Sequence, residues 1–389
     1  MPKRFAGALY SLFYSGQFVL LGVQLPFFAG WLTLNGFSAP EIGIVTALAL
    51  VARLGLGPFV AYWADTQIDE RRALTIVSGL FACGAAGLVA FDGKVLIALS
   101  AFIVLWTFGL LVPLTDSAVL RADRNGWLQY GQTRAVGSAA FLATTLIGGG
   151  VLGVLGVGAA APAMAIAAAF AFLASLALPP QAGDRGGARP QTWREAPRLL
   201  FNRVFLFALF ASGLTQGAHA VYYAFAYLRW SALGYSELII GALWATGVMA
   251  EILILIAARR LVRRRSPSLL FALGGAAATI RWAIIAAEPP LWILFPVQTL
   301  HAFTFAAAYL GAIEFVDRAV PPRLVNTAMT LMSATGVGAI TGVATAIAGF
   351  VWAGAGPGAA YLMMAAMGAG AFLCALVIRR IWPGGRILE

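Results

Sequence analysis

The chain has 389 residues, of which 61% are hydrophobic and only 11% charged, and its formal net charge is +11. A composition this apolar belongs in a bilayer rather than in water and indicates an all-α integral membrane protein. The two cysteines, Cys83 and Cys374, lie in apolar stretches without ligand spacing, so we predict neither a metal site nor a disulfide framework.

Long apolar runs between short polar loops predict the helices that cross the bilayer. A span needs about 20–25 residues, so a chain of this length accommodates about a dozen. We expect twelve spans near residues 8–33, 41–64, 73–91, 95–120, 129–149, 160–178, 205–228, 238–258, 268–287, 291–315, 325–352 and 358–380. The polar stretch 179–204 predicts a cytoplasmic linker between one six-helix bundle at 1–178 and a second at 205–389.

The basic residues predict how the chain is oriented. Of the 26 lysines and arginines, two lie in predicted outer loops, three lie inside predicted helices, and the other 21 fall on one side of the twelve-span arrangement. The positive-inside rule makes that side, and both termini, cytoplasmic. We therefore predict a multi-pass protein of the bacterial cytoplasmic (inner) membrane whose basic residues meet anionic lipid rather than nucleic acid.

The two predicted halves share a sequence repeat. The segment 36–53 returns 198 positions later as the segment 234–251, each with a small turn followed by an apolar helix. The charge in that helix is Arg53 in the first copy and Glu251 in the second. Such a repeat predicts two pseudo-symmetric halves around a central site. In the first copy, residues 38–41 match a capping box that starts the second span.

Charged side chains inside membrane spans are costly, so they face a partner or a wet cavity. Arg53, Arg134 and Arg281 are three such arginines, and a planar guanidinium suits a carboxylate because it donates two charge-assisted hydrogen bonds. Asp116 and Arg134 each lie five residues from the cytoplasmic loop 121–129. We expect them at one level, either as an ion pair or sharing one ligand.

Three residues inside later spans, His219, His301 and Glu251, are candidates for handling protons. Gln216, His219 and Tyr223 share one helix face, and His301 lies at a similar depth. The histidines are either hydrogen-bonding partners or proton-handling groups, and neither has a second metal ligand three or four residues away. Glu251 is either the partner of a buried arginine or a carboxyl that gains and loses a proton.

Aromatic residues lie on the same faces as these polar groups. Tyr14 shares a face of the first span with Tyr10 and Gln17, as Tyr223 does with His219. Such residues either hydrogen-bond between helices or form the wall of a site for an aromatic ring. The sequence carries no nucleophile or metal motif of an enzyme, so we predict no catalytic residue and no cofactor.

The arrangement of these motifs resembles the 3-phenylpropionate transporter branch of the major facilitator superfamily, a group related to lactose permease. The resemblance rests on segments spread over the whole chain, namely Val112–Asp116, Tyr130–Gly131 with Arg134, Gln216–Tyr223, Glu251, Arg281–Trp282 and Gln298–His301 with Thr304–Phe305. It implies the major facilitator fold, twelve transmembrane helices in two six-helix bundles that work by alternating access. It also places Asp116 and Arg134 at the substrate. Thr304 stands where lactose permease loads its proton on a Glu, and Gln298 stands where it has a Lys, so a coupled proton would be carried elsewhere.

A shorter resemblance concerns the loop after the second span. Asp65 with Arg71 and Arg72 is similar to the acidic and basic residues that major facilitator transporters place there, although Asp69-Glu70 intervenes and the expected glycine is missing. Their predicted role is a conformational gate on the cytoplasmic side.

The resemblance implies a secondary transporter, active as a monomer, that takes up a small aromatic carboxylate such as 3-phenylpropionate together with a proton. The candidate substrate-binding residues are Asp116, Arg134, Arg53, Arg281, Tyr14 and Tyr223, and the candidate proton-coupling residues are Glu251, His219 and His301. Two alternatives stay open within the same fold, a carrier of sugars or nucleosides and a drug exporter. A membrane receptor or enzyme is the alternative from another class.

Overall fold

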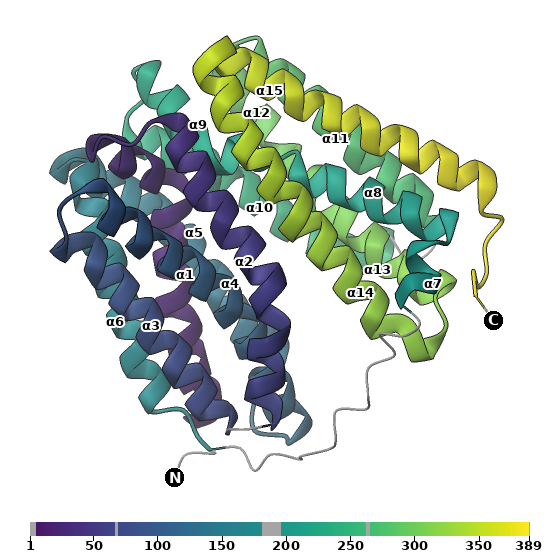
Figure 1. Ribbon diagram of the computed structural model, residues 1–389, viewed down its shortest axis with the longest axis horizontal. Helices are drawn as coiled ribbons and strands as arrows, with labels where there is room; N and C mark the ends of the chain where they lie inside the picture. The colour runs from purple at the N-terminus through teal and green to yellow at the C-terminus, as the bar shows by residue number, and fades with distance from the viewer. Residues whose placement is uncertain (1–4, 67–68, 181–195, 262–264, 389) are drawn as a thin grey trace. The chain divides into compact units, whose positions relative to one another are not determined.

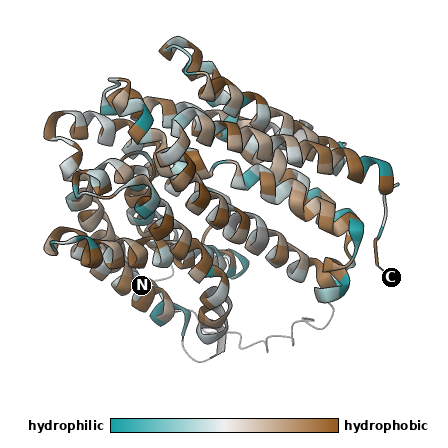
Figure 2. Cartoon of the chain, turned by 45° about the horizontal axis from the view of Figure 1, so that its top comes forward, coloured by the Kyte–Doolittle hydropathy of each residue, from teal (hydrophilic) through white to brown (hydrophobic). Residues whose placement is uncertain are grey.

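A computed structural model of the chain describes residues 5–66, 69–180, 196–261 and 265–388 (Figure 1). Within these ranges every regular element is helical and there is no β-strand. Hydrophobic residues prevail along the helices, and hydrophilic residues gather at helix ends and in loops (Figure 2). The fold class is therefore the predicted all-α membrane fold.

The predicted apolar segments are largely helical, although a turn at Ala218–His219 divides the predicted span 205–228 into two helices. In the described part of the chain, eleven helices are long and apolar enough to cross a membrane, and the last of them covers 327–381. That long stretch contains both of the final predicted spans, because the helix label continues through Gly356, whose φ of 88° and ψ of 170° are not helical. Gly356 and the following Pro357 therefore separate two spans where the sequence predicts a break.

Contacts along the chain divide it into two compact units. The first unit comprises residues 1–188 and 224–242, and the second unit comprises residues 189–223 and 243–389. The division into bundles at 1–178 and 205–389 remains a prediction from the sequence.

Six long helices build most of the first unit. They are α1 (Ala6–Leu34), α2 (Ala39–Thr66), α3 (Glu70–Ala90), α4 (Lys94–Arg124), α5 (Tyr130–Leu155) and α6 (Ala160–Leu176). Helix α1 packs against α5 and α6, and α3 packs against α4 and α6. The predicted capping interaction is present, since the backbone N–H of Ser38 donates to Glu41 Oε2 at 2.7 Å. Glu41 also binds Lys94 Nζ at 3.0 Å, which joins the start of α2 to the start of α4.

A hairpin from later in the chain completes the first unit. It consists of the end of α9 (Ala220–Ala232) and the start of α10 (Glu237–Leu261). A Cβ on Gly149 of α5 would lie 2.6 Å from the carbonyl oxygen of Glu237, and one on Gly30 of α1 would overlap the ring of Tyr227. Glycine at these positions allows the hairpin to lie directly against α1 and α5.

The second unit contains α7 (Ala196–Leu200), α8 (Arg203–Gly217), the rest of α10, α11 (Pro267–Ala286), α12 (Leu291–Thr299), α13 (Ala308–Ala319), α14 (Val325–Ser333) and α15 (Thr341–Ile381). Two predicted spans contain a π-helical turn, at Ala302–Ala307 between α12 and α13 and at Ala334–Ile340 between α14 and α15. A π-turn inserts a residue into a helix and shifts the faces on either side, and such turns are frequent at functional sites. The first of them begins directly after His301.

Small residues form the closest helix contacts of the second unit. A Cβ on Gly336 would lie 2.9 Å from the Cα of Gly213, so Gly336 is part of a packing surface against α8. A Cβ on Gly368 of α15 would lie 2.6 Å from the backbone nitrogen of Thr279 in α11. Close backbone approach thus stabilises both contacts.

Candidate functional site

Asp116 on α4 is the centre of a polar cluster in the first unit. Its Oδ1 accepts a hydrogen bond from Tyr14 Oη at 2.5 Å and lies 3.5 Å from Arg134 Nε. Tyr130 Oη donates to the same oxygen at 3.5 Å. The pairing of Asp116 with Arg134 that the sequence predicts is therefore present. Their side chains are 29% and 28% exposed, so neither is fully buried.

Aromatic rings cover the Arg134 guanidinium. Its Cζ lies 4.5 Å from the centre of the Phe18 ring and 5.5 Å from that of Tyr14. Beside them, Gln17 Nε2 donates to Thr115 Oγ1 at 3.1 Å. Gln17 is completely buried, and its Oε1 has no partner among the described residues. The cluster combines an ion pair, an aromatic face and an unused amide oxygen.

Arg53 forms no hydrogen bond or ion pair with Asp116 or Arg134 in the described part of the chain. Its side chain packs on α4, where a Cβ added to Gly109 would lie 2.8 Å from Arg53 Cδ. Among the described residues it has no hydrogen-bond or ion-pair partner.

Of the three gate candidates, Arg71 and Arg72 have separate surroundings. Arg71 Nη2 donates to the carbonyl oxygen of Leu176 at the end of α6, at 2.5 Å. Arg72 Nε lies 3.9 Å from Asp69 Oδ2 on an exposed surface. The side chain of Asp65 lies outside the described residues.

A second polar cluster lies within the second unit, around Arg281 of α11. Arg281 has no solvent-exposed surface. Its Nη2 donates to Gln298 Oε1 at 2.5 Å, and its Nη1 lies 3.0 Å from His301 Nδ1 and 3.3 Å from Thr304 Oγ1. The guanidinium also stacks on the ring of Trp282, with 4.3 Å from Cζ to the ring centre. The neighbours thus contact the guanidinium at both terminal nitrogens and at its face.

The hydrogen bonds define the protonated nitrogens of both histidines. A guanidinium only donates, so His301 Nδ1 accepts and the ring proton is on Nε2, which lies 3.3 Å from Glu251 Oε2. His219 Nδ1 lies 3.1 Å from the carbonyl oxygens of Thr215 and Gln216, so it donates there. His219 Nε2 is then the acceptor for the hydroxyl of Thr304 at 3.0 Å.

A continuous hydrogen-bonded path results. It runs from Glu251 through His301 and Arg281 to Thr304 and His219. Arg281 stays protonated and so does not itself pass a proton, but groups connected in this way respond together when the charge of one member changes.

The comparisons with known proteins agree with this fold. The family described as MFS_1 like family matches residues 8–363. The chain belongs to this family of the major facilitator superfamily. It is 30% identical over 361 residues to the probable 3-phenylpropionic acid transporter of Escherichia coli (strain K12), covering 91% of this chain and 93% of that protein. It is 26% identical over 366 residues to the maltose permease of Geobacillus stearothermophilus, covering 91% and 90%.

Solved transporter structures have the same fold. The nucleoside transporter NupG superposes with a TM-score of 0.80 at 16% identity, covering 96% of this chain and 99% of that chain. A variant of the peptide transporter POT superposes with a TM-score of 0.73 at 13% identity, covering 98% of both chains. The MFS_1-like chain is thus a multi-pass membrane protein and a secondary transporter of small molecules, and its relatives are transporters rather than enzymes.

Rings surround the Arg281 cluster of this MFS_1-like transporter. Tyr222 stacks on Trp244 with 4.2 Å between ring centres, and Tyr223 stacks on His219 at 5.3 Å. Of these, Tyr223 and His219 are among the candidate site residues predicted from the sequence. No pattern of polar residues in the sequence marks Trp244 as a site residue. Its contact with Tyr222 depends on how α10 packs in the folded chain.

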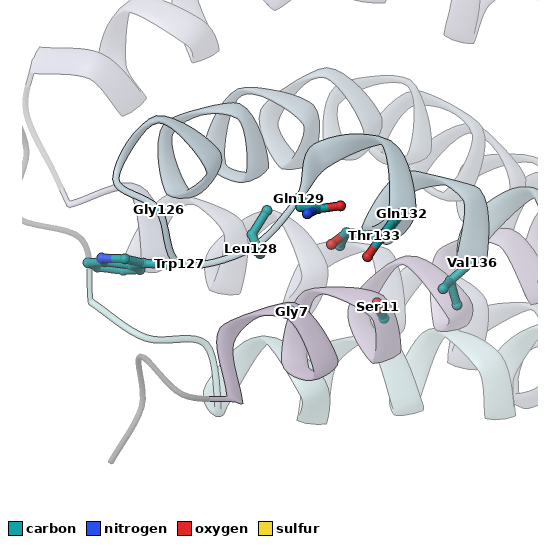
Figure 3. A pocket seen from close by; sticks show the side chains of 9 residues that line it. All are labelled: Gly7, Ser11, Gly126, Trp127, Leu128, Gln129, Gln132, Thr133 and Val136. Carbon is teal, nitrogen blue, oxygen red and sulfur yellow. The ribbon is translucent and has the colours of Figure 1, made fainter.

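A hollow of about 530 Å³ lies elsewhere in the first unit, between the start of α1 and the start of α5 (Figure 3). Its polar lining comes from side chains such as Ser11, Gln129, Gln132 and Thr133, which carry no charge. Neither Asp116 nor Arg134 lines it. We therefore assign the candidate site to the two charged clusters and not to this open hollow.

Proposed function

We propose that this transporter takes up a small aromatic carboxylate together with a proton, by alternating access. The observation that carries the proposal is Arg281, a completely buried cation whose hydrogen-bond partners among the described residues are all uncharged. A buried charge is expensive unless a charged partner compensates for it. A substrate carboxylate supplies that partner, because it accepts two charge-assisted hydrogen bonds from one guanidinium.

The aromatic rings around Arg281 support an aromatic substrate. The centre of the Tyr222 ring lies 4.9 Å from the guanidinium carbon of Arg281, and Tyr222 stacks on Trp244. The centre of the Trp282 ring lies 4.3 Å from the same guanidinium carbon. A substrate ring gains apolar burial and edge or face contacts among such side chains, about 0.5–1.5 kcal/mol per ring pair beyond the buried area. The printed name of the Escherichia coli relative, a probable 3-phenylpropionic acid transporter, supports that class of substrate.

The hydrogen-bonded path supports coupling to a proton. A carboxylate bound at Arg281 brings a second negative charge toward Glu251, which His301 connects to Arg281. Two neighbouring carboxylates favour binding one proton between them. Anion and proton therefore bind cooperatively, with Glu251 as proton carrier and His301 and His219 as relays.

Within the first unit, we propose that Asp116, Arg134 and Tyr14 contact the substrate. Arg53 of the same unit is a further cation without a partner among the described residues, and we propose it as a substrate-binding residue as well. Asp65, Arg71 and Arg72 act as the cytoplasmic gate. We place the protein in the bacterial inner membrane with both termini in the cytoplasm, active as a monomer.

Uptake into vesicles tests the proposal. Purified protein is reconstituted, and uptake of labelled 3-phenylpropionate is measured with and without an imposed inward proton gradient. We expect accumulation above equilibrium only with the gradient, and competition by other aryl carboxylates. Uptake that is indifferent to the gradient would remove proton coupling, and absence of binding to any aryl acid would remove the substrate class.

A neutral sugar or nucleoside is the second candidate. The Asp116 carboxylate accepts a phenol hydroxyl from Tyr14 at 2.5 Å, so a substrate hydroxyl fits the same oxygen. The maltose permease and the nucleoside transporter NupG among the similar proteins support this class. Competition by sugars or nucleosides, but not by aryl acids, would favour it.

A further inference from the structure

Gln298 of α12 holds an unusual position beside a buried charge. It has no exposed surface, and its Oε1 accepts from Arg281 Nη2 at 2.5 Å. Its Nε2 is buried without a hydrogen-bond partner among the described residues. The side-chain oxygen of Gln298 therefore accepts a hydrogen bond from Arg281, while its NH2 group donates to no described residue.

Gln298 is the residue that leaves the charge of Arg281 without a compensating anion. The other two hydrogen-bond partners, His301 and Thr304, are uncharged as well. Among the residues that the structure describes, no carboxylate is paired directly with Arg281. Glu251 is held on the opposite nitrogen of the His301 ring, so an imidazole separates it from the guanidinium.

The surroundings contain an excess of hydrogen-bond donors. Arg281 Nε, Trp244 Nε1 and Trp282 Nε1 are, like Gln298 Nε2, buried and without a partner among the described residues. They belong to one cluster, since Tyr222 packs 4.2 Å from Trp244 and 5.7 Å from Trp282 between ring centres. Buried donors without acceptors are unfavourable, so the cluster favours a ligand rich in acceptors. Next to a cation, that ligand is an anion.

We infer that Gln298 is the specificity-determining residue that makes this site select a carboxylate over its uncharged analogue. The amide oxygen of Gln298 accepts a hydrogen bond from Arg281 and so orients the guanidinium. Because this oxygen belongs to a neutral group, the positive charge of Arg281 stays available to pair with a substrate carboxylate. Its free amide nitrogen donates to the bound carboxylate. A glutamate of the same length would pair with Arg281 and occupy the charge permanently. The inference rests on the proposed function, because it names the residue that sets the charge of the substrate.

The substitution Gln298→Glu tests the inference with a matched pair of ligands, 3-phenylpropionate and its amide, 3-phenylpropionamide. The wild-type protein is expected to bind the acid more tightly than the amide. In the variant, the affinity for the acid should fall roughly 10- to 100-fold, the range of a lost charge-assisted hydrogen bond, while the affinity for the amide changes little. The acid-to-amide preference, measured by calorimetry or thermal stabilisation, should therefore collapse.

The chain offers a matched control in Gln216 of α8. It lies in the same unit, is partly exposed and has no described contact with Arg281. Gln216→Glu adds the same charge to the unit and should keep the preference for the acid. A collapse in this variant as well would show that any added carboxylate is sufficient, and would overturn the role of Gln298.

A second variant, Gln298→Met, covers the case in which Gln298→Glu does not fold. Methionine has a similar length and no charge, so Arg281 stays uncompensated and the acid should still be preferred, with at most about a 10-fold loss of affinity. Loss of the preference in Gln298→Met, or its retention in a folded Gln298→Glu, would overturn the inference while the proposed function stands. A wild-type protein that binds neither ligand would refute the proposed function itself.

Discussion

Replacing Thr304 by valine removes a hydroxyl that joins two buried groups of the second unit while keeping the shape of the side chain. The hydroxyl lies 3.0 Å from His219 Nε2 and 3.3 Å from Arg281 Nη1, and neither residue has exposed surface. In the valine variant His219 Nε2 loses its hydrogen bond, whereas Arg281 keeps Gln298 and His301. The proposed path from Glu251 to His219 is then interrupted.

The expected cost follows from these contacts. An unsatisfied buried nitrogen costs about 1–3 kcal/mol, and the longer contact to Arg281 adds about 1 kcal/mol or less. We therefore expect Thr304→Val to lose roughly 1–4 kcal/mol of stability and to melt at lower temperature. The affinity for 3-phenylpropionate should change by less than about 10-fold, because the main contacts of Arg281 remain.

Transport separates the role in coupling from the role in stability. In vesicles, substrate exchange without a gradient should be close to wild type, whereas gradient-driven accumulation should fall by about 10-fold or more, because the proposed proton-coupling residue His219 loses its hydrogen-bonded connection to Arg281 and His301. Thr304→Ser, which keeps the hydroxyl, is the control and should behave as wild type. Equal accumulation by the valine and serine variants would refute the relay, and equal melting temperatures would refute the assigned hydrogen bonds.

Three further predictions concern single contacts. Asp116→Asn should lower stability by about 1–2 kcal/mol and abolish transport, because it leaves the partly exposed Arg134 without its carboxylate partner. A double variant that adds Arg134→Gln should recover the melting temperature but not transport if the pair has a role at the substrate. Gly368→Ala should destabilise the protein by about 1–3 kcal/mol, because the added Cβ would lie 2.6 Å from a backbone nitrogen of α11. Gly354→Ala in the same α15 should stabilise the protein slightly, because nothing lies within 4 Å of the added Cβ. Thermal melts showing the reverse order would contradict this packing. Arg386→Ala should lower the melting temperature without changing ligand affinity. The reason is that Arg386 Nη1 donates to the carbonyl oxygen of Asp317 at 2.7 Å and so connects the C-terminal segment to the end of α13. A changed affinity would contradict a purely structural role.

Several features of the site could be predicted from the chain. Asp116 and Arg134 lie at equal distances from one loop, and in the structure they form an ion pair at 3.5 Å. The sequence also identifies Arg281, Glu251 and His301 as polar groups inside apolar spans, and the structure connects them through hydrogen bonds. Their roles in binding and coupling remain predictions.

Other features depend on packing and could not be predicted. The π-turn after His301 changes the faces that its helix presents, which a regular period of 3.6 residues does not anticipate. The pair of Arg121 with Glu70, at 3.5 Å, joins α4 to α3 and has no pattern in the sequence that marks it. Likewise, the contacts of Gly30 and Gly149 with the hairpin 224–242 join segments far apart in the chain.

The sequence by itself determined the class of protein, the positions of its apolar helices and the residues whose charge inside them demands an explanation. These properties depend on hydrophobic length and local composition, which neighbouring residues along the chain define. Only the tertiary structure decided that Arg281 meets Gln298, His301 and Thr304 while Glu251 meets the far side of His301. The physical reason is that a hydrogen bond forms over about 3 Å between groups on different helices, so its partners are selected by packing and not by spacing along the chain.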